Sequence, residues 1–393
     1  MIWGTVSRPS LERTLVWLDR AGVALGLLLL ARMIRMSLKY HGDVPFTDEW
    51  EMYRPGGIGT ALNVNWLFAF HNEHRLLMTK LIAWALLNVD HLRLKSQVVI
   101  NLVMYFTLTV GIVTFCRRRL QAPLGILLGI FGCALTYEIH IWSFQTHFTV
   151  CPLAFCAALL ALLRRDRGVY WAIPAVFVSV YSFSQGIVCG ALVAGTSLAL
   201  AWRHPKERKR YILVAAACVP ILSLWFIGLP ASGPKAMPWS AQYWLFAGVQ
   251  LSRGFGYDSA MPAIGLVFGA AVVALCAYHV WRWSTDRSTD DAWLIAVVFT
   301  LAGMATVALI ANGRAVGLFE FATSSRYMQN ILLFVPVSWA LAYPLMRNHP
   351  SLVMASLLLI IVPYGNEYNF RATYGSFHRA VSPRDRPPGC DRC

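Results

Sequence analysis

Residues 96–119 read SQVVINLVMYFTLTVGIVTFCRRR, an apolar run that ends in three arginines. A helix needs about 20 mostly apolar residues to cross the hydrocarbon core of a bilayer, and this run is long enough. Basic residues directly after such a run are typical of the cytoplasmic end of a span. The stretch therefore predicts a membrane-spanning α-helix whose carboxyl end faces the cytoplasm.

Composition extends this interpretation to the whole chain. Of its 393 residues, 57% are hydrophobic and only 13% are charged, about half the charged fraction of soluble domains. The net charge of +15 comes from clusters between apolar runs. Because no basic stripe with stacking aromatics accompanies them, these clusters indicate membrane topology and exclude a nucleic-acid partner. We expect an all-α, polytopic integral membrane protein with about 11 transmembrane helices, in the range of about 10–12. The expected spans are 16–38, 96–116, 121–138, 147–163, 168–184, 186–202, 211–229, 259–281, 292–312, 327–346 and 351–365.

The expected domain organisation is simple. Residues 1–365 form one transmembrane domain with a large outer loop at 39–95, and residues 366–393 form a polar tail. The tail carries Cys390 and Cys393 in a C-x-x-C pattern. This pair could form a disulfide or half of a metal site, but a disordered terminus is the simpler interpretation.

Basic clusters between the apolar runs fix the expected topology. All of them lie in the cytoplasm if the N-terminus is cytoplasmic and the loop 39–95 is outside. This arrangement requires that the segment 75–89 does not cross the bilayer. The segment is short and amphipathic, so we expect an interfacial helix at about 73–89 with Asn72 as its N-cap. The clusters are Arg117–Arg119, Arg164–Arg167 and Lys206–Arg210.

The outer loop begins with FTDEWEMY at residues 46–53, which places two acids side by side. A loop of this length between spans is typical of a functional segment. Asp48 could act as a general base toward a hydroxyl or amine nucleophile, with Glu49 beside it. Asp48 and Glu51 also have the spacing of a capping box. Asp48 could therefore equally cap a short helix, and Glu49 could be a solvated loop acid.

A second polar group in the loop contains His71, Glu73, His74 and Arg75. A guanidinium group can bind phosphate oxygens through two parallel hydrogen bonds, so Arg75 is a candidate phosphate ligand. His74 could bind a metal ion, but no second ligand at helical spacing supports a zinc site, and we expect none. Alternatively, Arg75 extends from a helix start toward the lipid headgroups. We name Glu73, His74 and Arg75 as candidate substrate-binding residues.

Further candidates stand at the outer ends of predicted spans. Residues 138–148 read EIHIWSFQTHF and include Glu138, Gln145 and His147, and a later span begins with Arg326 and Tyr327. An acid at membrane depth is costly unless it is paired or hydrated, so we predict that Glu138, His147 and Arg326 line one cavity. Amide and aromatic side chains suit a sugar ligand. The alternative is ordinary interfacial anchoring by Trp and His side chains.

The order of these features resembles the N-terminal region of the GT-C superfamily of membrane glycosyltransferases, as in protein O-mannosyltransferases and lipid A aminoarabinose transferases. The features here are Asp48-Glu49, then His74-Arg75 before an interfacial helix, then the span 96–116 with its arginines. The resemblance covers about residues 15–120, and this chain lacks the family's Pro-Pro pair and large soluble C-terminal domain. It implies an inverting transferase with Asp48 at the position of the catalytic base and Glu49 as its partner. The chain is also similar to uncharacterised bacterial membrane proteins with NEHR, WxxQ and SRY elements, which imply no activity.

We therefore expect a glycosyltransferase at the outer face of a bacterial inner membrane. It would move a sugar from a polyprenyl-phosphate-linked donor to a glycan or lipid acceptor of the cell envelope, with membrane lipid as its other partner and with no cofactor. One alternative is a transporter or flippase for lipid-linked saccharides, which would place polar groups at mid-membrane in broken helices. Another is a polysaccharide polymerase or ligase, which an outer loop rich in arginine instead of acids would favour.

Overall fold

The computed structural model describes residues 8–42, 45, 47–54, 56–91, 93–132, 136–231, 233–253, 261–317, 322, 324–349 and 353. The expected span 351–365, apart from Val353, lies outside the described residues. The same holds for the tail 366–393 with Cys390 and Cys393.

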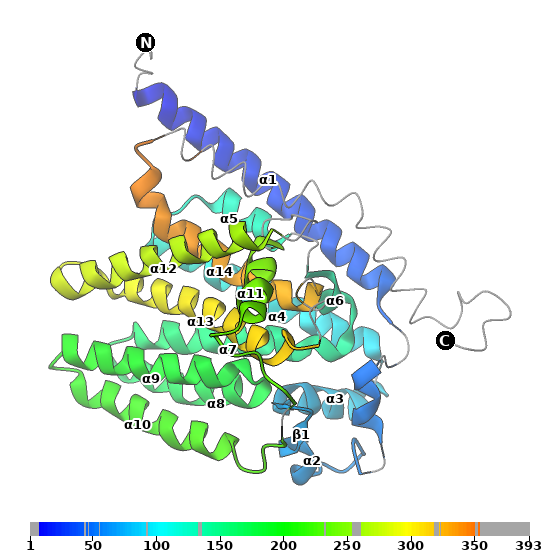
Figure 1. Cartoon of the computed structure of the whole chain (residues 1–393). Helices are drawn as coiled ribbons and strands as arrows, with labels where there is room; N and C mark the ends of the chain where they lie inside the picture. Colours follow the sequence, from blue (N-terminus) through cyan, green and yellow to red (C-terminus); the bar gives the residue numbers. More distant parts are fainter. Residues whose placement is uncertain are drawn as a thin grey trace.

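The described chain is almost entirely helical and contains one two-stranded antiparallel hairpin (Figure 1). The α-helices are α1 (Arg8–Tyr40), α2 (Val64–Phe68), α3 (Leu77–Asp90), α4 (Leu94–Arg119), α5 (Leu124–Phe131), α6 (Tyr137–Ile141), α7 (Thr146–Leu162), α8 (Ala172–Ser182), α9 (Gln185–Arg203), α10 (Arg208–Trp225), α11 (Ala241–Arg253), α12 (Pro262–Thr285), α13 (Asp291–Arg314) and α14 (Ser325–Met346). The shorter elements are the 3-10 helices η1 (Thr47–Tyr53), η3 (Ser143–Gln145) and η4 (Arg167–Trp171) and the strands β1 (Phe70–His71) and β2 (His74–Arg75).

Within the described chain, seven helical segments are long and apolar enough to cross a membrane. They are Val16–Tyr40, Leu94–Arg119, Ser143–Leu162, Gln185–Arg203, Pro262–Thr285, Asp291–Arg314 and Ser325–Met346. Each overlaps an expected span. The expected spans 121–138, 168–184 and 211–229 coincide with shorter helices, since α5 has 8 residues, α8 has 11 and α10 has 18. The protein is thus an all-α membrane protein with several candidate spans, and the larger number of about 11 stays a prediction.

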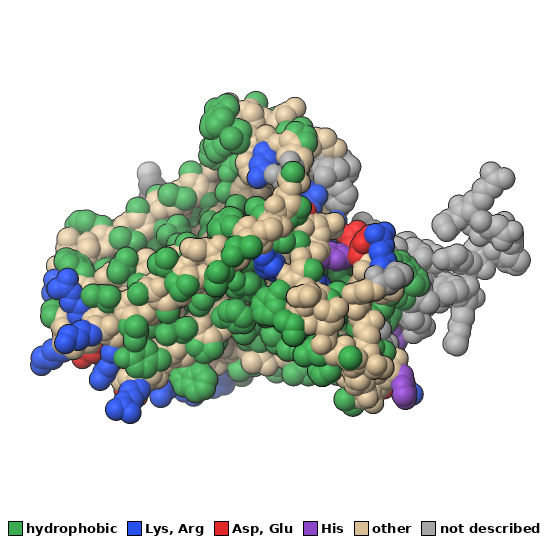
Figure 2. All heavy atoms as spheres, turned by 90° about the horizontal axis from the view of Figure 1, so that it is seen from below, with side chains coloured by type: hydrophobic (Ala, Val, Ile, Leu, Met, Phe, Trp, Pro, Cys, Tyr) green, Lys and Arg blue, Asp and Glu red, His purple; other side chains and the backbone are tan. Residues whose placement is uncertain are grey.

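The basic clusters gather at one end of the helix bundle. Arg119 at the end of α4 lies 3.4 Å from Asp290, and both Arg165 and Arg203 lie 3.4 Å from Asp291. Figure 2 shows Lys and Arg side chains at one end, on the left, and a group of acidic and histidine side chains toward the other end, with apolar surface between them. The three basic clusters are separate in the sequence but lie together at one end of the fold.

Exposed tryptophans mark both ends of the bundle. Trp residues are enriched where a membrane protein meets the two headgroup layers, because the ring is apolar and its N–H is polar. The exposed tryptophans at the basic end are Trp17, Trp171, Trp202 and Trp281, and those at the opposite end are Trp50, Trp239 and Trp244. Their placement fits a bilayer that surrounds the apolar middle of the bundle.

Helices α1 and α5 approach each other through glycines. A Cβ atom built on Gly125 would lie 2.2 Å from the backbone oxygen of Asp19, and one on Gly26 would lie 2.6 Å from the Cβ of Leu128. The backbone N–H of Gly125 also donates a 2.8 Å hydrogen bond to the carboxylate of Asp19. Such close packing over small residues is a common basis of helix association in membranes. It holds the short helix α5 against the long helix α1 (Figure 1).

A helix, α3, is present where the interfacial helix is expected, but its start differs from the prediction, and its location in the interface stays a prediction. Residues 70–75 form the β1–β2 hairpin, and α3 begins at Leu77 with Leu76 as its N-cap. The assignment of Asn72 as N-cap is therefore wrong. Asn72 lies in the hairpin turn with a φ of 52°, a left-handed conformation that asparagine tolerates better than most residues.

Candidate functional site

The two loop acids have different environments. Both lie in the first turn of η1, but Asp48 is exposed whereas Glu49 is only 1% exposed. The carboxylate of Glu49 accepts hydrogen bonds from Trp142 Nε1 at 3.2 Å and from Ser143 Oγ at 2.5 Å. Glu49 thus fastens the outer loop to the segment between α6 and α7. Asp48, its neighbour, is left facing the aqueous side of the loop.

The β1–β2 hairpin places two histidines over the start of α7. The ring of His71 lies 5.0 Å from that of Phe144, and the ring of His74 lies 4.6 Å from that of Phe183. The ring of His147 also lies 4.8 Å from that of Phe183. The hairpin, α7 and the turn before α9 therefore meet around one aromatic side chain.

Burial keeps the hairpin histidines neutral. It lowers the pKa of His74 to about 4, although the carboxylate of Glu73 acts in the opposite direction. Burial also lowers the pKa of His71, against the effect of the nearby Asp48 carboxylate. At neutral pH these imidazoles can exchange hydrogen bonds but do not supply positive charge. Positive charge near these histidines comes instead from Arg314 and Arg326 around His74 and from Lys80 near His71.

Glu73 joins the hairpin to the end of α13. Its carboxylate lies 2.6 Å from a guanidinium nitrogen of Arg314, and both side chains are partly exposed. His74 Nε2 lies 3.7 Å from the same carboxylate. Two residues that are 241 positions apart in the sequence thus pair at the end of the bundle opposite to the basic clusters.

Arg75 uses its guanidinium to bind backbone oxygens. It donates to the carbonyls of Phe68 at the end of α2 and of Trp225 and Ile227 at the end of α10. The group also lies over the ring of Phe70 at 4.1 Å. Arg75 is only 8% exposed. These contacts tie the hairpin to α10, and they engage all three guanidinium nitrogens with backbone carbonyls.

We expect Arg75→Lys to lower the stability of the folded protein by roughly 2–4 kcal/mol, because an ammonium group cannot reach carbonyls on two separate helices. Thermal unfolding of the purified protein measures the change. Arg54→Lys is the control, since Arg54 is exposed and forms its ion pair with Glu51, three residues before it. A normal melting temperature together with weaker binding of lipid phosphate would contradict this role and make Arg75 a ligand.

Glu138 lies at the first turn of α14. Its carboxylate accepts hydrogen bonds from the Arg326 backbone N–H at 3.2 Å and from Ser324 Oγ at 3.3 Å. Its own N–H donates to Ser325 Oγ at 3.2 Å. A carboxylate is favourable at this position because the N-terminus of a helix carries partial positive charge. These hydrogen bonds offset the desolvation free energy of an acid at the end of a membrane helix.

The expected substrate-binding residues from three separate segments lie at one end of the bundle. Glu138 contacts the start of α14, where Tyr327 packs 6.3 Å from Phe148, and Phe148 in turn lies 4.7 Å from His147. Burial is the main cause of the low pKa of His74, and Glu73 opposes it. The positive charges of Arg314 and Arg326 are close enough to His74 to lower its pKa further. Gln145 is buried at the end of η3. The loop acids, the hairpin, the start of α7 and the start of α14 thus lie near one another, and the cavity expected between Glu138, His147 and Arg326 stays a prediction.

A set of buried amides was absent from the candidates that the sequence suggested. Gln97 and Asn101 of α4 and Gln329 of α14 are each 1% exposed, and each donates a hydrogen bond to the stretch 143–148. The signal for them was present in the sequence, because Gln97 and Asn101 stand four residues apart in an otherwise apolar run. Spacing alone, however, does not show which helix such a pair contacts.

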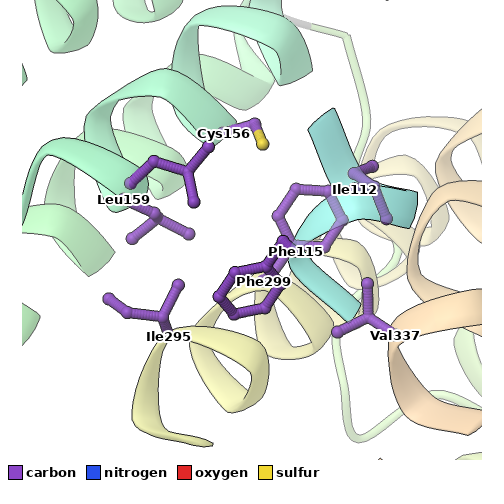
Figure 3. Close-up of a pocket in the computed structure, with 8 residues that line it drawn as sticks. Ile112, Phe115, Cys156, Leu159, Ile295, Phe299 and Val337 are labelled. Carbon is purple, nitrogen blue, oxygen red and sulfur yellow. The ribbon is translucent and has the colours of Figure 1, made fainter. Parts of the chain in front are cut away.

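A small cavity elsewhere in the bundle has no features of a ligand site. It lies between α4, α7, α13 and α14, and its lining is apolar, including Ile112, Phe115, Cys156 and Phe299 (Figure 3). Its volume of about 10 Å³ is at the lower limit for one water molecule. It is a packing gap within the membrane core.

The arrangement described above brings acidic, histidine and amide side chains from several segments together at one end of the bundle. Within the described ranges, no three His, Cys, Asp or Glu side chains are grouped so that they could hold a metal ion. Comparison with known proteins adds no further assignment, since no protein-family model and no curated protein matches this sequence.

Proposed function

We propose that the protein is a glycosyltransferase that uses a polyprenyl-phosphate-linked sugar at the outer face of a bacterial inner membrane. The observation that carries this proposal is the position of the loop acids. Glu49 binds Trp142 and Ser143 between α6 and α7, so the turn of η1 that carries Asp48 is held against the segment that leads into α7. A lipid-linked donor can reach this end of the bundle from the bilayer, and an acceptor can reach Asp48 from solution.

The proposed chemistry is a single displacement. Asp48 accepts the proton of an acceptor hydroxyl or amine, which attacks the anomeric carbon. The lipid phosphate leaves from the opposite face of the sugar, so the configuration at the anomeric carbon inverts. Arg326 stabilises the negative charge that develops on this phosphate. Its position supports the role, because its backbone is anchored by Glu138 at the start of α14. Glu49 positions Asp48 through the contacts of η1.

Transfer of a radiolabelled sugar in reconstituted vesicles tests the proposal. Vesicles containing the purified protein receive a polyprenyl-phosphate sugar and a candidate acceptor fraction, and the product is analysed for its anomeric configuration. An inverted, covalently linked product supports the proposal. Movement of intact lipid-linked sugar across the vesicle membrane, without transfer, would instead establish a transporter.

The proposed location requires the loop 39–95 to face outward, and cysteine labelling tests this. Gly59 and Arg118 are suitable positions, because both are exposed and a side chain at Gly59 meets no atom within 4 Å. In a background without Cys133, Cys390 and Cys393, an impermeant thiol reagent added to whole cells should label Gly59→Cys and spare Arg118→Cys. The six described cysteines are buried and should stay silent. Labelling of Arg118→Cys alone would reverse the orientation and remove the basis of the proposal.

A further inference from the structure

Three buried amides from two helices converge on one short stretch of backbone. Asn101 Nδ2 donates to the Ser143 carbonyl at 3.1 Å, and Gln97 Nε2 donates to Thr146 Oγ1 at 3.1 Å. From the other side, Gln329 Nε2 donates to the Phe148 carbonyl at 2.9 Å. Side chains of both α4 and α14 thus donate hydrogen bonds to the stretch 143–148.

These contacts fix which way each amide points. A carbonyl can only accept a hydrogen bond, so Asn101 and Gln329 must direct their NH₂ groups toward it. Thr146 Oγ1 donates its own hydrogen to the Ser143 carbonyl at 3.0 Å, so it acts as the acceptor for Gln97. The oxygen atoms of all three amides are therefore the atoms that remain for other partners.

Those oxygens have no hydrogen-bond donor within the described part of the chain. The same is true of Gln145 Oε1 and Thr149 Oγ1, which belong to or follow directly after the same stretch. Buried polar atoms are nearly always paired in folded proteins. If these amides only joined helices, as polar side chains often do in membranes, both ends of each amide would be expected to find partners. The unpaired oxygens point to a ligand that brings donors.

The chemistry of the group selects the kind of ligand. Amide oxygens accept hydrogen bonds but carry no full charge, so they suit hydroxyl groups and do not suit a phosphate. The group also adjoins the loop acids, because Ser143 donates its hydroxyl to Glu49 while its carbonyl accepts from Asn101. A ligand bound to these oxygens would therefore lie close to the buried carboxylate of Glu49, the neighbour of Asp48.

We propose that Gln97, Asn101 and Gln329 form a buried subsite that binds the hydroxyl groups of a saccharide. Its identification as the sugar portion of a lipid-linked donor rests on the function proposed above. The acceptor oxygens on α4 and α14 determine how the sugar is oriented, and the lipid phosphate lies outside this subsite.

Binding to protein in nanodiscs without sugar-based detergent tests the subsite. The probes are undecaprenyl phosphate and the same lipid carrying glucose, galactose or arabinose. At least one sugar-bearing probe should bind wild-type protein more tightly than the bare lipid phosphate. Asn101→Leu, Gln97→Met and Gln329→Met should each reduce that preference by about tenfold, because each removes one buried acceptor. Affinity for the bare lipid phosphate should stay unchanged.

Gln250→Met is the matched control, since Gln250 is a fully buried glutamine of α11 whose amide makes no hydrogen bond to the stretch 143–148. Its sugar preference should equal that of wild type. Three separate variants keep the test valid if one of them fails to fold. The proposal is overturned if the folded variants retain the preference for a sugar-bearing probe, or if no probe shows such a preference. It is also overturned if Na⁺ or K⁺ alone, without a sugar, stabilises the wild-type protein and fails to stabilise the three amide variants. Sugar preference without any transfer would keep the subsite and reject the transferase.

Discussion

Asp48→Asn should lower sugar transfer by at least about 10²-fold while leaving folding and donor binding intact. The substitution removes the proton acceptor but keeps a side chain that caps a helix as well as aspartate does. Asp48 is exposed, so the change creates no buried defect. Single-turnover transfer with saturating donor measures the chemical step, and donor affinity is measured separately. A variant with normal turnover would show that Asp48 is not the base.

Glu49→Gln provides the companion measurement. Glu49 is buried and accepts from two donors, whereas an amide in its place has a single acceptor oxygen and no charge, so both charge-assisted hydrogen bonds are weakened and one must be lost or reversed. We expect a lower melting temperature and a smaller loss of turnover than for Asp48→Asn. The two substitutions together separate proton transfer from positioning, because Asp48 is exposed and Glu49 anchors the loop. Equal losses of turnover at both positions would make them a joint catalytic unit.

Gly125→Leu should prevent stable folding, with a loss of at least about 3 kcal/mol. A side chain there would collide with the backbone of α1, since an added Cβ already lies 2.2 Å from the Asp19 oxygen and 2.6 Å from the Val23 nitrogen. Backbone atoms cannot move aside as a flexible side chain can, so α1 and α5 would have to separate. The yield of monodisperse protein and its melting temperature measure the effect.

Gly195→Leu is the control for this substitution. Gly195 is also inside a helix, but a Cβ there meets nothing within 4 Å. Leucine has a higher helix propensity than glycine, so this variant should be as stable as wild type or slightly more stable. Similar melting temperatures for the two variants would mean that α1 does not depend on α5 for its position.

Much of the fold was predictable from the sequence because a membrane span is a local property. About 20 apolar residues in a row make a spanning helix wherever they occur, and basic residues at one end indicate its direction. Seven expected spans therefore coincide with long apolar helices, and the helix expected at about 73–89 is present as α3. The hairpin itself was missed, because strands of two residues leave no periodic pattern.

That the chain is a helical membrane protein with a polar, acidic loop follows from local patterns, because apolar length and clustered charge can be recognised without knowing any contact. The role of each polar residue, in contrast, became visible in the three-dimensional arrangement. Glu49 is buried and Asp48 exposed, Arg75 binds backbone carbonyls, and Glu138 meets the start of α14. Such roles depend on contacts between residues far apart in the chain, as with Glu73 and Arg314, and the distance between two helices is set by how their surfaces pack, which no local pattern encodes.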